Sequence, residues 1–146
     1  MCDFEKLCAF PELALFKIPE PDYWEAQLAR LISTNWFVVV HWRESNYIHR
    51  GPDPRRDFDP TVALPIYDAI LQAGGSVVRI GHPGMSPFPG KEGLVDLANA
   101  DVLLQAYAVS RSRFFLELGA SGPASLALPF GVPSLRCNQT IIGRAF

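Results

Sequence analysis

A turn of small residues near the C-terminus contains the residues best placed for chemistry. Residues 119–123 read Gly-Ala-Ser-Gly-Pro, and their small side chains allow a ligand to approach the backbone closely. Ser121 can cap a following helix, and Pro123 suits the first helical turn, where a backbone N–H is not needed. Gly119, Ser121 and Gly122 are therefore candidate ligands for a phosphate at the start of a helix. The same spacing fits a well-capped turn that binds nothing.

A second group, His41-Trp42-Arg43-Glu44, follows directly on the apolar run of residues 38–40. Arg43 can bind a diphosphate through two parallel N–H···O bonds, a geometry that lysine cannot reproduce. If the strand continues, alternation places His41 and Arg43 on one side and Glu44 on the other. The alternative is a strand end that meets water, with Arg43 and Glu44 forming an exposed ion pair worth about 0–1 kcal/mol.

Four further residues are weaker candidates. Arg79 lies inside an apolar run and must find a partner or reach solvent, because burying an unpaired arginine is costly. Gly81 and His82 follow that run, and His82 fits a loop histidine equally well. Arg56 lies in a polar, proline-rich stretch, where an arginine is more often solvated than part of a site. The three histidines are scattered without metal-ligand spacing, so we expect neither a metal site nor a cofactor.

Apolar runs and turn signals predict the elements that position these residues. We expect helices over residues 22–33, 60–73, 101–112 and 121–130, and strands over 36–40, 76–80, 113–118 and 134–137, with a weaker strand over 94–97. Asp22 and Glu25 have the spacing of a capping box at the first helix. This alternation predicts an α/β, Rossmann-like, mostly parallel sheet with helices on both faces. Because ligands bind at the carboxyl ends of such strands, we expect the candidate residues around one crevice.

Length and composition favour a single domain. The chain has 146 residues, of which 49% are hydrophobic, enough for a sizeable core. We expect residues 1–21 to form an N-terminal arm and residues 22–146 to form the domain. The net charge of −2 argues against a general nucleic-acid binder, and no apolar stretch approaches the ~20 residues of a membrane span. Cys2, Cys8 and Cys137 contain no CxxC pair and leave one cysteine over, which favours a cytoplasmic setting without a disulfide framework.

Several segments resemble a known family. Residues 37–44 (FVVVHWRE), Arg56 and residues 64–81 (LPIYDAILQAGGSVVRIG) resemble a group of bacterial glycosyltransferases with a GT-B-like fold. Residues 113–133 (RFFLELGASGPASLALPFGVP) are similar to the final nucleotide-binding segment of the same group. The HxRE sequence is also similar to the HxRR motif of the fucosyltransferase superfamily. The resemblance covers most of the chain, about residues 36–138.

The resemblance implies the Rossmann-like half of a GT-B enzyme, which binds a nucleotide-diphosphate sugar. By resemblance, Arg43 contacts the diphosphate, His41 shapes the pocket, and Ser121 and Gly122 contact phosphate. Arg56 matches an arginine that follows the first motif loop. The sugar would transfer through an oxocarbenium-like transition state, with Arg43 and the helix start stabilising the departing diphosphate.

Two residues and the acceptor-binding domain also bear on this hypothesis. Glu44 is a candidate base for the acceptor hydroxyl. His82 stands where the family pattern predicts an acidic residue. A GT-B enzyme also needs an acceptor-binding domain, which we expect in trans or from a homodimer.

The leading hypothesis is a glycosyltransferase-like domain, of the hexosyl or fucosyl type if active. The alternative is a non-catalytic nucleotide-binding or protein-interaction module with the same fold.

Overall fold

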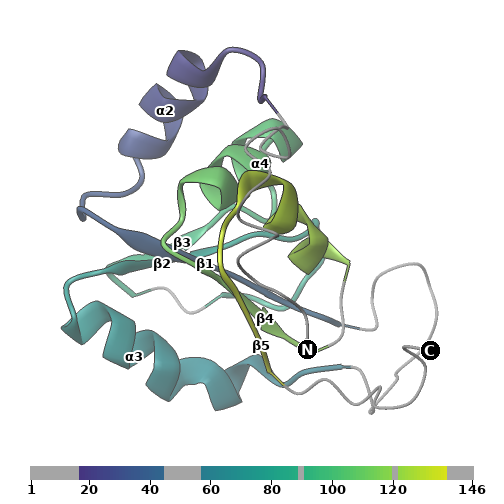
Figure 1. Ribbon diagram of the computed structural model, residues 1–146. Coiled ribbons are helices and arrows are strands. Elements are labelled where there is room, and N and C mark those ends of the chain that lie inside the picture. Colours follow the sequence, from purple (N-terminus) through teal and green to yellow (C-terminus); the bar gives the residue numbers. More distant parts are fainter. Residues whose placement is uncertain (1–16, 45–56, 89–90, 120–121, 138–146) are drawn as a thin grey trace, which may run out of the picture.

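The computed structural model of the protein describes residues 17–44, 57–88, 91–119 and 122–137. A parallel sheet of five strands forms its centre (Figure 1). The strands lie in the order β3-β2-β1-β4-β5 and comprise β1 (Phe37–Trp42), β2 (Ser76–Arg79), β3 (Leu94–Asp96), β4 (Phe115–Leu118) and β5 (Ser134–Cys137). Each neighbouring pair of strands is parallel. The predicted parallel, Rossmann-like sheet is therefore confirmed.

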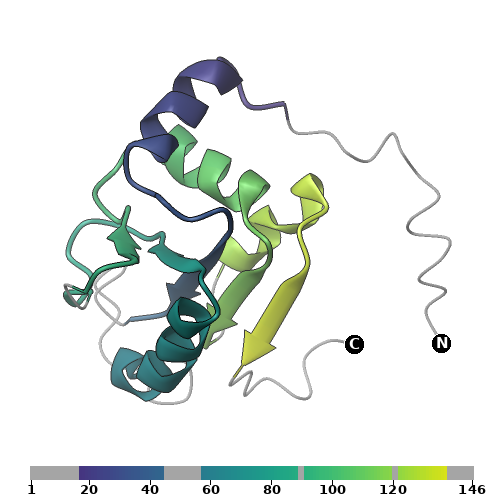
Figure 2. The ribbon, with the colours of Figure 1, turned by 90° about the vertical axis from the view of Figure 1, so that its left-hand side faces the viewer.

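Helices cover both faces of the sheet, as predicted. The helices α2 (Pro21–Ala29) and α4 (Val102–Arg111) pack on one face, and α3 (Leu64–Gln72) packs on the other (Figures 1 and 2). The connections contain the 3-10 turns η3 (Pro60–Ala63), η4 (Pro123–Leu126) and η5 (Leu128–Phe130). In the described part of the chain, no helix is both long enough and apolar enough to cross a membrane.

The strand β1 shows why a continuous apolar run predicts a central strand. All of its residues are buried. Val39 belongs to the core on the side of α2 and α4, whereas Val38 and Val40 belong to the core on the side of α3. A strand covered on both faces has no polar side, so its sequence does not alternate. The strand continues past the predicted end to include His41 and Trp42.

The strand order reverses at β1, which has β2 on one side and β4 on the other. In this register, Val40 of β1 lies opposite Arg79 of β2, and His41 lies opposite Glu117 of β4. Ligands of open α/β sheets bind outside the carboxyl ends of the strands at such a reversal. The end of β1 is therefore where this fold is expected to place a ligand.

The predicted helix over residues 121–130 is wrong. The described part of this segment forms the two short 3-10 turns η4 and η5. Pro129 explains the difference, because a proline in the interior of an α-helix removes a backbone donor and clashes with the preceding turn. Gly131, at a φ of 66°, then ends the second turn.

The predicted capping box is also wrong. The helix α2 begins at Pro21, after Glu20, which has a φ of 51° and makes no side-chain capping bond. Asp22 therefore lies inside the first turn rather than before it. Glu25 instead accepts a hydrogen bond from the Tyr107 hydroxyl at 3.3 Å, which links α2 to α4.

Other boundaries also differ from the predictions. The helix α2 ends at Ala29 rather than at residue 33, and the N–H groups of Leu31 and Ile32 both bond to the Leu28 oxygen as the chain leaves it. The strand β4 begins at Phe115 rather than at residue 113, although the backbone of residue 113 already bonds to β1. These shifts leave the residues that follow each strand in their predicted places.

Candidate functional site

A pocket of about 660 Å³ opens at the carboxyl ends of β1 and β2. Four segments form its wall: the end of β1, the loop after β2, the turn that leads into α4, and η4. The lining residues are His41, Trp42, Arg43, Glu44, Ile80, Gly81, His82, Pro83, Ala98, Asn99, Ala100, Val102, Gln105, Gly122, Pro123 and Leu126. The pocket is thus mainly apolar, with a few polar groups that converge on it.

Six of the residues singled out from the sequence line this pocket. They come from three separate segments and are His41, Arg43, Glu44, Gly81, His82 and Gly122. The structure therefore brings together the groups after β1 and β2, together with part of the turn after β4. Their roles remain predictions.

Two of the other predicted residues, Arg79 and Gly119, are not among the residues that line the pocket. Arg79 is buried in β2, on the side of the sheet that α3 covers. Gly119 follows β4 with a φ of 83°, and its N–H donates to the Cys137 oxygen at 3.0 Å. That amide is therefore already used within the sheet. Arg56 and Ser121 lie outside the described residues.

His41 forms a buried part of the pocket wall and is only 6% exposed. Its pKa is lowered from 6.5 to about 4, mostly by burial and also by the nearby charges of His82 and Arg79, which Glu44 partly opposes. Its imidazole is therefore neutral at physiological pH. A neutral imidazole can accept as well as donate a hydrogen bond.

Arg43 forms an ion pair with Asp57, with its Nε 3.3 Å from Asp57 Oδ1. Its backbone is held on both sides, since its N–H donates to the Leu118 oxygen and its carbonyl accepts from the Phe58 N–H. The sequence allowed an exposed ion pair between Arg43 and Glu44 as an alternative. In the structure Arg43 pairs with Asp57 instead, and Glu44 bonds to Ser86. The charge of Arg43 therefore sits at the pocket with a carboxylate beside it.

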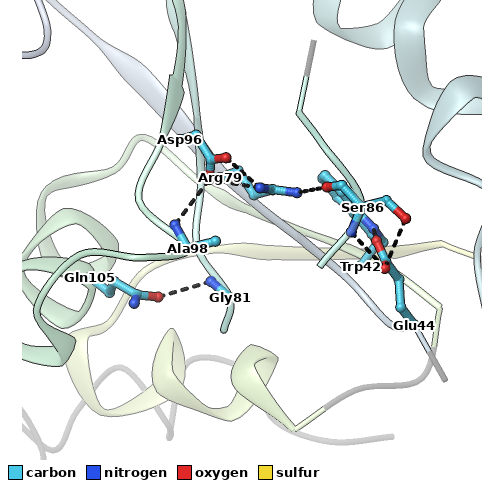
Figure 3. A network of polar contacts seen from close by, with 8 residues as sticks. All are labelled: Trp42, Glu44, Arg79, Gly81, Ser86, Asp96, Ala98 and Gln105. Carbon is cyan, nitrogen blue, oxygen red and sulfur yellow. Dashed lines mark hydrogen bonds and ion pairs between the residues drawn. The ribbon is translucent and has the colours of Figure 1, made fainter. Parts of the chain in front are cut away.

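Glu44 and Gly81 each make specific hydrogen bonds at the pocket (Figure 3). Glu44 accepts hydrogen bonds from the Trp42 indole and from the backbone and hydroxyl of Ser86. Gly81 donates its N–H to Gln105 Oε1 at 2.9 Å, which ties the loop after β2 to α4. The loop after β2 is therefore held at Gly81 and again at Ser86.

The turn after β4 offers less to an anion than the sequence predicts. A phosphate site at a helix start depends on the dipole of an α-helix, whereas η4 is a four-residue 3-10 turn. Gly122 occupies the N-cap position before this turn, and no side chain makes a capping bond there. Gly122 and Pro123 still line the pocket. Their contribution is therefore close backbone approach rather than a helix dipole.

Sequence reasoning missed two charged residues within the sheet. Glu117 is buried in β4, with its Oε2 3.2 Å from Arg136 Nε of β5. Asp96, at the end of β3, pairs with Arg79. A charge inside an apolar strand is the signal that drew attention to Arg79, and the same signal in the segment FLEL points to Glu117.

The described residues contain no group of three or more histidine, cysteine, aspartate or glutamate side chains that could hold a metal ion. At the pocket, Arg43 pairs with Asp57, and Glu44 accepts hydrogen bonds from Trp42 and Ser86.

Two solved structures are similar to the chain. One is a family 9 glycosyl transferase from Veillonella parvula, with a TM-score of 0.59 and 17% identity over 82% of this chain. The other is the ADP-heptose lps heptosyltransferase II of E. coli, with a TM-score of 0.62 and 11% identity over 84% of this chain. The chain has the fold of one Rossmann-like half of a GT-B glycosyltransferase. No protein-family model and no curated protein matches it.

At these identities the likeness establishes the fold alone. The chain spans 35% of the Veillonella protein and 38% of the E. coli protein, about a third of each. Within this chain, the pocket lies at the carboxyl ends of the five-stranded parallel sheet.

Proposed function

We propose that this chain is a glycosyltransferase-like domain whose pocket binds a nucleotide-diphosphate sugar. The observation that carries the proposal is the convergence of Arg43 and His41 from β1 with Gly81 and His82 from the loop after β2. These residues meet at the reversal of strand order, in a fold shared with two glycosyltransferases. A capped turn or a solvated strand end does not account for this convergence.

The pocket supplies two kinds of contact for such a ligand. Arg43 presents a planar guanidinium, which can hold two phosphate oxygens at once. Ala98, Ala100 and Val102 supply an apolar wall of the kind that packs against a nucleoside. Gly122 allows a phosphate to approach the backbone closely.

Transfer would break the bond between the sugar carbon and the diphosphate oxygen, and the acceptor hydroxyl oxygen would form the new bond. The proton of that hydroxyl passes to a base, and the electron pair of the broken bond stays on the diphosphate. Arg43 would stabilise the charge that develops there. The acceptor would be presented by a second domain in trans or by a second copy of the chain.

A thermal-shift panel tests the proposal. Sugar conjugates of UDP, GDP, CMP and dTDP are added separately, and a ligand that binds the folded state raises the melting temperature by several degrees once it exceeds its Kd about 100-fold. Arg43→Ala should abolish that rise, because it removes the guanidinium. A rise that survives Arg43→Ala would contradict the role of Arg43. The absence of a rise with all of the conjugates would contradict the proposed function.

A second candidate function is a non-catalytic interaction module. Val102 and Leu128 are 74% and 80% exposed, and Val102 lies on the rim of the pocket. Exposed apolar side chains near a pocket are typical of a surface that contacts another protein. Light scattering that shows a stable dimer, together with no nucleotide response at millimolar concentration, would favour this function.

A further inference from the structure

Glu44 uses both oxygens of its carboxylate within the protein. Oε1 accepts a hydrogen bond from the Trp42 indole, and Oε2 accepts from the Ser86 N–H at 2.8 Å and from the Ser86 hydroxyl at 3.0 Å (Figure 3). Glu44 and Ser86 lie 42 positions apart in the chain. Glu44 therefore joins the end of β1 to the loop that follows β2.

Ser86 is held from a second direction by Arg79. The Arg79 Nη1 donates to the Ser86 carbonyl, while Asp96 of β3 accepts from Arg79 Nε at 2.9 Å and from its Nη2. The guanidinium also lies over the Trp42 ring at 4.8 Å. The peptide groups of Ser86 are thus bonded to a carboxylate on one side and to a guanidinium on the other.

Ser86 follows directly on the tight turn that forms one wall of the pocket. Gly84 has a φ of 92°, and the Met85 N–H bonds to the His82 oxygen, so the loop turns tightly back on itself. A Cβ at Gly81 would lie 2.2 Å from the Met85 sulfur, which shows how closely the two halves of the turn pack. Gly81, His82 and Pro83, on the first half of this turn, line the pocket.

We infer that Glu44 is a positioning residue, which acts through Ser86 to hold the Gly81–Pro83 wall of the pocket in place. Both Glu44 oxygens accept hydrogen bonds, from Trp42 and from Ser86, which is the arrangement of a carboxylate that holds neighbouring groups in place. The effect of Glu44 on the loop is independent of the ligand. Its effect on nucleotide affinity rests on the proposed function.

Amide hydrogen exchange, measured by NMR on the full chain, tests the effect on the loop. Ser86 is exposed, so protection of its amide reports mainly the bond to Glu44. Glu44→Ala should speed exchange of the Ser86 amide about tenfold or more, since a hydrogen bond to a charged group is lost. It should also shift the Trp42 indole resonance and leave the amides of β1 unchanged. Glu92→Gln, which neutralises an exposed carboxylate, is the matched control.

Isothermal titration with UDP and with GDP, in the absence of any acceptor, tests the effect on the pocket. Loosening the wall reduces the fraction of binding-competent molecules, so Glu44→Ala should weaken binding about threefold to tenfold. A catalytic base acts only on the acceptor, so its loss would not weaken this affinity, and removal of its negative charge would favour a diphosphate. If the wild-type chain binds neither nucleotide, the proposed function fails, while the exchange measurement still decides the role of Glu44.

Two milder variants keep the inference testable if Glu44→Ala fails to fold. Glu44→Gln retains one oxygen acceptor and should produce an intermediate exchange rate at Ser86. Ser86→Ala keeps the backbone donor and loses only the hydroxyl bond, so it should have the smallest effect. Wild-type exchange at Ser86 in both Glu44 variants would overturn the inference.

Discussion

Arg43 and Asp57 form an ion pair at the mouth of the pocket, with 3.3 Å between Nε and Oδ1. Both side chains are about one-fifth exposed, at 19% and 21%. The residue predicted to bind a diphosphate therefore already has a carboxylate beside it. Arg43 and Asp57 lie 14 positions apart in the chain. The N–H of the next residue, Phe58, also donates to the Arg43 oxygen, so a backbone bond accompanies the ion pair.

Neutralising Asp57 should strengthen diphosphate binding. Asp57→Asn keeps an oxygen that can accept from Arg43 Nε but removes a negative charge that repels the ligand. We expect the Kd for UDP or GDP to fall about threefold to tenfold at low salt, and by less at 0.3 M salt, where the repulsion is screened. Titration calorimetry at two ionic strengths measures this. An equal or weaker affinity at low salt would show that the carboxylate serves mainly to orient Arg43.

The path of the main chain could be predicted from local patterns. The run from Phe37 to Val40 predicts a strand covered on both faces, because such a strand has no polar side. The helix predicted from residue 101 also starts at a local signal, since Asp101 accepts a capping bond from the Leu103 N–H at 2.7 Å. Each of these features depends on residues only a few positions apart, so the sequence contains the whole signal.

The partners of the charged residues could not be predicted in the same way. The partner of Arg79 is Asp96, and the partner of Glu44 is Ser86, each brought close by the pairing of strands and the course of a loop. Single-sequence patterns do not specify which strands are neighbours or in which register they pair. The expectation that Arg79 needs a partner was correct, but naming Asp96 required the sheet.

Breaking the pair of Arg79 and Asp96 should be costly. Arg79 has a side chain that is only 3% exposed, so Asp96→Ala leaves a buried charge without its carboxylate. We expect a loss of about 3 kcal/mol in the free energy of unfolding, with partial recovery in the double variant Arg79→Met, Asp96→Ala. Urea denaturation of the single and double variants measures this.

The control is the exposed pair of Lys91 and Asp68, whose side chains are 56% and 49% exposed. Asp68→Ala should change stability by less than about 0.5 kcal/mol, because solvent screens an exposed pair. Equal losses for Asp68→Ala and Asp96→Ala would contradict the argument from burial.

Two aspartates near helix starts should differ in their contribution to stability. Asp101 caps α4 through the Leu103 N–H, whereas Asp22 lies inside the first turn of α2 without such a bond. Asp101→Ala should therefore cost about 1 kcal/mol and Asp22→Ala less than about 0.5 kcal/mol. Thermal or urea unfolding of both variants measures the difference. A larger loss for Asp22→Ala would mean that the predicted capping box forms after all.

The buried imidazole of His41 should make the protein less stable as the pH falls. Its pKa is about 4 in the folded state, against 6.5 for a free histidine, because burial disfavours the charged ring. Between these values the unfolded chain binds a proton that the folded chain does not, so the free energy of unfolding falls as the pH drops from 6.5 towards 4. This difference amounts to about 3 kcal/mol at full extent.

Urea denaturation at pH 7 and pH 4.5 should show a smaller drop in the free energy of unfolding for His41→Gln than for the wild type. NMR titration should place the His41 midpoint near 4. A midpoint near 6.5 would rule out the neutral imidazole assigned to the pocket wall.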